Sequence, residues 1–62
     1  MDCDKLRERV KKYHNDTQVS YKKIAEDTNI SYSIFYNFTS NIRGLKEKYY
    51  LSLDTYLTEK GY

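Results

Sequence analysis

The chain has 62 residues, with 11 lysine and arginine residues against 9 aspartate and glutamate residues, which gives a formal net charge of +2. A chain of this length forms one domain, and folding buries only about 60% of the surface that its unfolded form exposes. The single cysteine, Cys3, excludes an internal disulfide and a thiolate cluster for zinc. No apolar run approaches the roughly 20 residues of a membrane span, and the N-terminus does not resemble a signal peptide. We therefore expect one domain over residues 1–62, in a reducing, cytoplasmic compartment and without a membrane partner.

The first expected helix runs from about Asp4 to Tyr13. Leu6, Val10 and Tyr13 recur at helical spacing, so they share one apolar face. Acidic residues at the start of this segment favour a helix N-terminus, where a carboxylate meets unpaired amides. The polar segment 14–18 is prone to turns and is predicted to end the helix.

Two short helices are expected in the middle of the chain, and each begins with a serine. The first opens at Ser20 and runs to about Asp27, and the second opens at Ser31 and runs to about Ser40. Serine is a favoured N-cap because its hydroxyl accepts an amide of the first turn. The residues expected to face inward around these helices are Val19, Ile24, Ala25, Ile30, Phe35, Phe38 and Ile42.

The segment 20–38 meets the physical demands of a helix-turn-helix motif. Ile24 and Ala25 provide an apolar residue followed by a small one, where two helices cross closely. Asn29 tolerates the positive φ that the turn requires, and Ile30 then seals the turn. The inward phenylalanines of the second helix follow at the spacing that this arrangement needs.

A last helix is expected from about Leu45 to Glu59, and Gly61 suits the C′ position that follows a helix. Leu51 projects roughly opposite the apolar face of this helix. That face is expected to carry Leu45, Tyr49, Tyr50, Leu53, Tyr56 and Leu57. The chain as a whole therefore predicts an all-α fold, a compact four-helix domain with a central helix-turn-helix.

The region from about Leu6 to Tyr56 resembles the XRE/Cro-type helix-turn-helix domain of phage and bacterial repressors. The matching residues are Leu6, Val19, Ser20, Ile24, Ala25, Asn29, Ile30, Ser31, Phe35, Phe38, Tyr49, Tyr50 and Leu53. The resemblance implies a lambda-repressor-like fold and a sequence-specific transcriptional regulator of the Cro or small-repressor kind. Such a protein would bind double-stranded DNA in the cytoplasm and be nucleoid-associated when bound.

In a helix-turn-helix, the second helix of the motif lies in the major groove, and flanking groups contact phosphates. The expected base contacts are Ser31, Tyr32, Ser33, Tyr36, Asn37 and Ser40. The expected phosphate contacts are Ser20, Tyr21, Lys22, Lys23, Asn41, Arg43, Lys46 and Lys48. One small domain makes few contacts, so we expect a homodimer, preformed or assembled only on DNA. Its expected interface residues are Tyr50, Leu51, Leu57 and Tyr62.

No charged residue occurs between Thr28 and Ile42. The commonest specific base contact, from Arg or Lys to guanine, is therefore missing from the expected recognition helix. Three interpretations follow: a preference for A·T-rich sites through Asn37 and apolar contacts, a modest affinity for DNA, or a protein partner for the tyrosine-rich face. The second functional hypothesis is accordingly a protein-binding adaptor of the same fold, such as a phage anti-repressor or an inhibitor of a host protein.

Catalytic patterns are missing from the sequence. It contains no glycine-rich phosphate loop, no nucleophile–base pair and no set of residues at metal-ligand spacing. His14 is expected to be a helix-end or surface residue, and Cys3 a small residue at a helix start. We therefore expect no enzyme activity, no metal, no cofactor and no small-molecule ligand.

Overall fold

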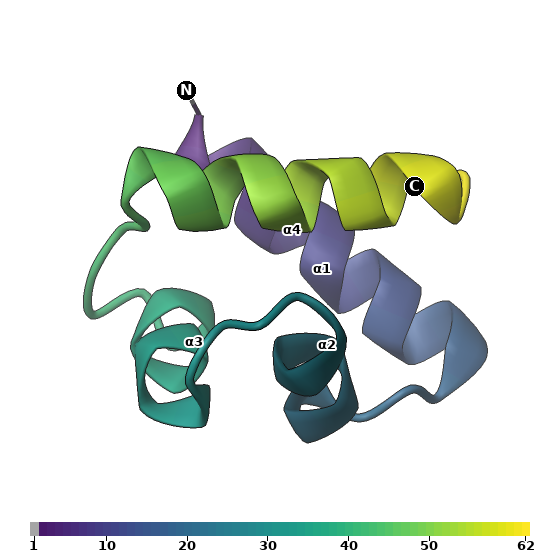
Figure 1. Cartoon of the computed structure of the whole chain (residues 1–62). Helices are drawn as coiled ribbons and strands as arrows, with labels where there is room; N and C mark the ends of the chain where they lie inside the picture. The colour runs from purple at the N-terminus through teal and green to yellow at the C-terminus, as the bar shows by residue number, and fades with distance from the viewer. Residues whose placement is uncertain (1) are drawn as a thin grey trace.

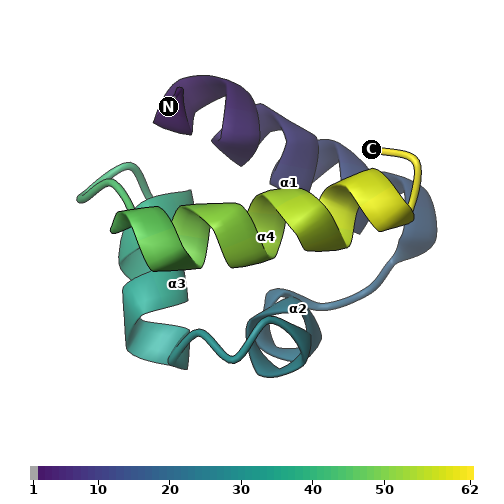
Figure 2. The same ribbon diagram turned by 45° about the horizontal axis from the view of Figure 1, so that its top comes forward.

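A computed structural model describes residues 2–62, which form four α-helices and no β-strand. The helices are α1 (Cys3–Thr17), α2 (Tyr21–Asp27), α3 (Tyr32–Thr39) and α4 (Glu47–Glu59). Figures 1 and 2 show α2 and α3 side by side along one side of α4, while α1 crosses α4 and also contacts α3. The overall extents are 24 × 20 × 19 Å, so the expected compact all-α domain is confirmed.

One apolar core joins the four helices. Its fully buried side chains are Leu6 and Val10 of α1, Ile24 of α2, Phe35 and Phe38 of α3, and Leu53 and Leu57 of α4. These are the residues that helical periodicity assigns to the inward faces. Each helix buries only one stripe, because four short helices enclose a small interior. The outward stripes of all four helices therefore stay available to solvent or a partner.

Three helices begin at the caps that the sequence predicts. Asp2 accepts the backbone amide of Lys5 at 3.1 Å, and so caps α1. Ser20 and Ser31 cap α2 and α3 by accepting the amide three residues further on, at 3.1 and 3.4 Å. Among the described residues, no side chain caps α4, whose N-cap position is Lys46.

The ends of α2 and α3 use the same backbone device. Asn29 and Asn41 both have left-handed backbones, with φ of 58° and 61°. The amide of the next residue, Ile30 or Ile42, then donates to a carbonyl five residues back, at 3.0 and 2.9 Å. Gly61, with φ of 85°, follows α4 in the same way. These bonds satisfy helix-end carbonyls, as in a Schellman motif, and they confirm the roles expected for Asn29 and Gly61.

The position of Ile42 is a correction. The sequence predicts Ile42 in the buried stripe of α3, but 62% of this residue is exposed. The helix ends at Thr39 and the left-handed Asn41 turns the chain away from the helical path. A residue four positions after Phe38 therefore no longer lies on the same face.

The end of α1 is a second correction. The helix continues to Thr17 instead of ending at Tyr13. The Thr17 hydroxyl donates to the Tyr13 carbonyl at 2.6 Å, and the amide of left-handed Gln18 donates to the His14 carbonyl at 2.8 Å. The polar residues thus bond to the helix backbone instead of opening a turn. At the other end of the chain, α4 starts two residues after Leu45, which is buried outside the helix.

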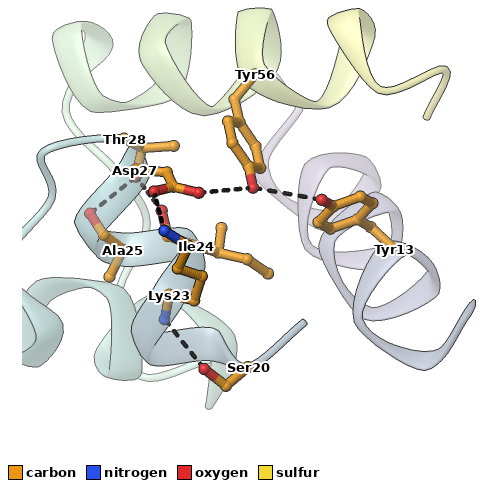
Figure 3. A network of polar contacts seen from close by, with 8 residues as sticks. All are labelled: Tyr13, Ser20, Lys23, Ile24, Ala25, Asp27, Thr28 and Tyr56. Atoms are coloured by element: carbon orange, nitrogen blue, oxygen red, sulfur yellow. Dashed lines mark hydrogen bonds and ion pairs between the residues drawn. The ribbon is translucent and has the colours of Figure 1, made fainter. Parts of the chain in front are cut away.

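Tyr56 of α4 joins three helices through its hydroxyl (Figure 3). It donates to the Asp27 carboxylate of α2 at 3.2 Å and lies 3.4 Å from the Tyr13 hydroxyl of α1. Because Tyr56 has one proton to give, Tyr13 is the donor in the second contact. Burial and these two contacts raise the pKa of Tyr56 above its ordinary value of 10.0. This network holds α2 against the α1–α4 pair.

Candidate nucleic-acid interface

The outward face of α3 is exposed, polar and uncharged. Tyr32 and Tyr36 are 52% and 53% exposed, whereas the six other tyrosines of the chain are buried or half-buried. Ser33 and Ser40 are also exposed, as is the capping residue Ser31. Asn37, the remaining predicted base contact, is half-buried. The six predicted base-contact residues therefore lie on one helix and its two caps, with Asn37 the least accessible.

The inward side of α3 fixes how this face is presented. Phe35 and Phe38 are fully buried and their ring centroids lie 6.5 Å apart. The Tyr21 ring of α2 packs 5.8 Å from Phe35, so α2 supports the same side of the helix. Packed aromatic rings resist rotation of the helix about its axis, since any rotation would open the core.

Arg7 of α1 anchors the C-terminal end of α3, and sequence reasoning missed it. Only 7% of this residue is exposed, and its Nε donates to the carbonyl of Phe38 at 2.5 Å. Its guanidinium lies 4.8 Å from the centroid of the Phe38 ring, and its Nη1 pairs with Asp4 at 2.7 Å. A cation at this position complements the negative end of the α3 dipole, for which α3 itself has no basic residue. The available signal was spacing, because Arg7 lies four residues after Cys3 and three before Val10, on the inward face.

The predicted phosphate contacts form two groups, and Figure 1 shows α3 between the elements that carry them, α2 and the loop leading to α4. Lys22 and Lys23 lie exposed on α2. Lys23 pairs with Asp27 at 3.1 Å, a contact that raises the pKa of Lys23 and lowers that of Asp27 (Figure 3). The second group is exposed around the loop and the start of α4, and it comprises Asn41, Arg43, Lys46 and Lys48.

A shallow hollow connects α3 to the second basic group. Its volume is about 300 Å³, and its lining residues are Ile34, Asn37, Arg43, Gly44, Lys46 and Tyr49. The Asn37 side chain therefore shares one surface with Arg43 and Lys46. The structure brings one predicted base contact together with two predicted phosphate contacts that lie six and nine residues further along the sequence.

Two predicted phosphate contacts at the start of α2 have other partners. The Ser20 hydroxyl accepts the amide of Lys23 as the helix cap. The Tyr21 ring is half-buried and stacks on His14 at a centroid distance of 4.4 Å, and burial raises the pKa of Tyr21. His14 in turn contacts the carbonyl of Val19 at 2.6 Å through Nδ1, so it is the helix-end residue that the sequence predicts.

The predicted dimer residues do not form one surface. Leu57 is fully buried in the core, so its assignment to an interface is wrong. Tyr62 packs on Tyr13, with centroids 5.2 Å apart, and its hydroxyl donates to Asp16 at 3.0 Å. The half-buried Tyr50 hydroxyl accepts the amide of Asp2 at 3.2 Å. Leu51, at 51% exposure, is the one member of this set with a large accessible apolar side chain.

Within residues 2–62, no three His, Cys, Asp or Glu side chains are grouped so that they could hold a metal ion. No helix in the same range is long and apolar enough to cross a membrane. Comparisons with family models, with curated proteins and with solved structures found no match to this chain.

Proposed function

We propose that α2, the turn after it and α3 act as a helix-turn-helix, and that this protein is a sequence-specific regulator that binds double-stranded DNA. The observation that carries the proposal is the outward face of α3, a short helix with exposed hydrogen-bonding side chains and basic groups on either side. A helix of this kind fits the major groove, which admits a single α-helix and presents base edges to it. The mode of action would be that of a Cro-like or small repressor, which occupies a promoter.

The contacts fall into two classes. The exposed side chains of α3, from Ser31 to Ser40, would face base edges. Lys22 on one side and Arg43, Lys46 and Lys48 on the other would contact phosphates, which set the register of the protein on the duplex. Lys23 would contribute less, because Asp27 already balances its charge.

A second copy on a neighbouring half-site would strengthen binding, since one α3 and about four phosphate contacts give little affinity alone. Leu51 is the most exposed apolar residue of α4, and the tyrosines of this helix, Tyr50 among them, are only half exposed to such a copy. This area is small beside the roughly 800 Å² per partner of a stable interface. We therefore propose that the homodimer assembles on DNA rather than before it.

A salt titration of binding to a random-sequence duplex tests this function. Each neutralised phosphate steepens the dependence of log K on log salt by about 0.9, so four contacts should weaken binding roughly a hundredfold between 50 and 200 mM salt. Replacing both Arg43 and Lys46 by alanine should reduce the slope by about 2. The matched control replaces two exposed lysines of α1, Lys5 and Lys12, and should leave the slope unchanged. The absence of duplex binding at low salt would contradict the proposal.

A second test addresses the reading face. The double variant Tyr36→Ala, Asn37→Ala removes two outward side chains of α3 and leaves its buried phenylalanines in place. Binding to a duplex selected from a random pool should fall, while binding to random duplex and the melting temperature should change little. If affinity for the selected duplex were unchanged, α3 would not be the helix that reads bases.

The second candidate function is a protein-binding adaptor of the same fold, an anti-repressor or an inhibitor of another protein. The observation in its favour is the exposed pair Tyr32 and Tyr36 on an uncharged helix. Tyrosine is enriched at protein interfaces, which are depleted in charge at their centres. The same salt titration distinguishes the two functions. A DNA-binding regulator binds the duplex with the steep salt dependence of phosphate contacts, whereas an adaptor for a protein partner does not.

A further inference from the structure

The side chains of α3 define which bases they are able to read. Arg and Lys are the usual readers of guanine, and Asp and Glu accept from the cytosine amino group. None of these occurs between Asp27 and Arg43. The remaining outward groups are the hydroxyls of Ser33 and of the two cap serines, which contact several bases, one amide at Asn37, and two tyrosine rings. The Thr39 hydroxyl already donates to the Tyr36 carbonyl. Asn pairs with adenine, and apolar surface packs against the thymine methyl group.

The distance between the two tyrosine rings is close to two base-pair steps of a DNA duplex. Tyr32 and Tyr36 are one helical turn apart, so they project from the same face of α3. Their ring centroids lie 6.4 Å apart, and both residues are more than half exposed. Successive base pairs rise by about 3.4 Å, so two steps cover about 6.8 Å. A helix lying along the groove would therefore bring the two rings to base pairs that have one other base pair between them.

We infer that the DNA site under α3 is A·T-rich and contains two thymines separated by one base pair, whose methyl groups pack against Tyr32 and Tyr36. This inference rests on the proposed function, because it names the class of sequence that the same face would read. Asn37, next to Tyr36, would pair with an adjacent adenine. Phe35, on the same helix, is fully buried in the core and holds the backbone that carries the two rings.

Replacement of single thymines by uracil tests the inference directly. Uracil lacks the methyl group and keeps every hydrogen-bonding group of thymine, so minor-groove contacts and base pairing stay unchanged. A duplex selected from a random pool is scanned with one replacement at a time. In each half-site, uracil at two positions with one base pair between them should weaken binding about fourfold per position, the value expected for one buried methyl group.

Substitutions assign each thymine to its tyrosine. Tyr32→Ala should abolish the effect of uracil at one of the two positions, and Tyr36→Ala should abolish it at the other. Tyr32→Phe and Tyr36→Phe keep the rings and should keep both effects. Thr55→Ala, at an exposed position of α4, is the matched control and should also keep them.

The outcomes separate this inference from the function on which it rests. Salt-dependent binding with no effect of uracil, or with an effect that survives both alanine variants, would overturn the inference and leave DNA binding in place. Selection of G·C-rich duplexes would overturn it as well. Failure to bind any duplex at low salt would overturn the proposed function and the inference together.

Discussion

Two groups of tyrosines in this chain have opposite surroundings. Tyr13, Tyr56 and Tyr62 pack edge to face, with centroids 5.8 and 5.2 Å apart, and their hydroxyls contact one another or a carboxylate. Tyr32 and Tyr36 lie on α3 with more than half of each residue exposed. The first group connects α1, α2 and α4 (Figure 3), whereas the rings of the second group lie next to each other on one helix, with centroids 6.4 Å apart.

The difference indicates that tyrosines serve two roles in this chain, one in stability and one in binding a partner. A buried tyrosine contributes apolar area and one hydrogen bond to stability, while an exposed one contributes the same properties to a partner. The scaffold of α1, α2 and α4 is fastened by the first group and by Arg9, which bonds the carbonyl of Tyr62 at 2.9 Å and pairs with Asp54. The α3 face depends on this scaffold for its position and adds little to its stability.

The largest expected effect on stability comes from removing a buried side chain of α3. Phe35→Ala should lower the free energy of unfolding by about 3–5 kcal/mol, because it opens a cavity under α3 where the side chain is fully buried. Small domains have about 5 kcal/mol in total, so the variant should keep at most about 2 kcal/mol and be marginally stable at room temperature. Urea denaturation followed by circular dichroism measures the loss. Ser33→Ala, on the exposed side of the same helix, is the control, and equal stability of the two variants would contradict the assignment of faces.

The next effect concerns the link between α1 and α3. Arg7→Ala should cost about 2 kcal/mol, the value for a hydrogen bond to a charged group, since the carbonyl of Phe38 loses its charged donor and keeps only backbone amides such as that of Asn41. Lys11→Ala, at an exposed position on the same helix, should cost less than about 0.5 kcal/mol. The two melting temperatures are compared at neutral pH. If the two variants had the same melting temperature, Arg7 would not anchor α3.

Much of the scaffold follows from the sequence because its determinants are local. Helical spacing identifies the inward residues, serines mark the starts of α2 and α3, and Asn29 marks the turn between them. Ile30 and Ile42 show where local reasoning ends. Both follow a left-handed asparagine with the same backbone bonds, yet Ile30 is 3% exposed and Ile42 is 62% exposed. Burial after a turn depends on which helices lie nearby, and the turn sequence does not carry that information.

The candidate site is less predictable than the scaffold for the same reason. The exposed face of α3 follows from periodicity, and Leu51 is exposed as expected. Arg7 was missed because a charged residue at an inward position looks like surface until its acceptor on α3 is known. From the sequence, Leu57 is expected both on the inward face of the last helix and in the dimer interface. The structure shows that it is fully buried in the core. The hollow that joins Asn37 to Lys46 depends on the path of the loop between them.

A smaller effect tests the fastened tyrosines. Tyr56→Phe should cost about 1 kcal/mol at neutral pH, because the bond to Asp27 is lost while the ring stays packed. The raised pKa of Tyr56 means that the folded state keeps this proton more tightly than the unfolded state does. The associated stability is complete below pH 10 and is lost as pH rises through the folded pKa. Melting temperatures measured above pH 10 should therefore fall less steeply for Tyr56→Phe than for the wild type.

Tyr21 and Tyr62 also have raised pKa values, so part of the alkaline loss should remain in the Tyr56→Phe variant. Tyr62→Phe is the matched comparison. It also removes a tyrosine with a raised pKa, but the main cause of that shift is the hydrogen bond to Asp16, not a bond to Asp27. If the melting temperature of the Tyr56→Phe variant fell with pH as steeply as that of the wild type, the contacts of Tyr56 would not raise its pKa in the folded state.

The smallest effect on stability is expected for the exposed pair. Tyr32→Ala combined with Tyr36→Ala should change the free energy of unfolding by less than about 0.5 kcal/mol, because neither ring packs into the core and alanine favours the helix. The same double variant should lose most of its affinity for a selected duplex. Tyr13→Ala, its counterpart in the fastened group, should cost stability first and affinity only as the protein unfolds. A double variant that lost stability as Tyr13→Ala does would place the α3 rings in the scaffold and remove the contrast from which their function is argued.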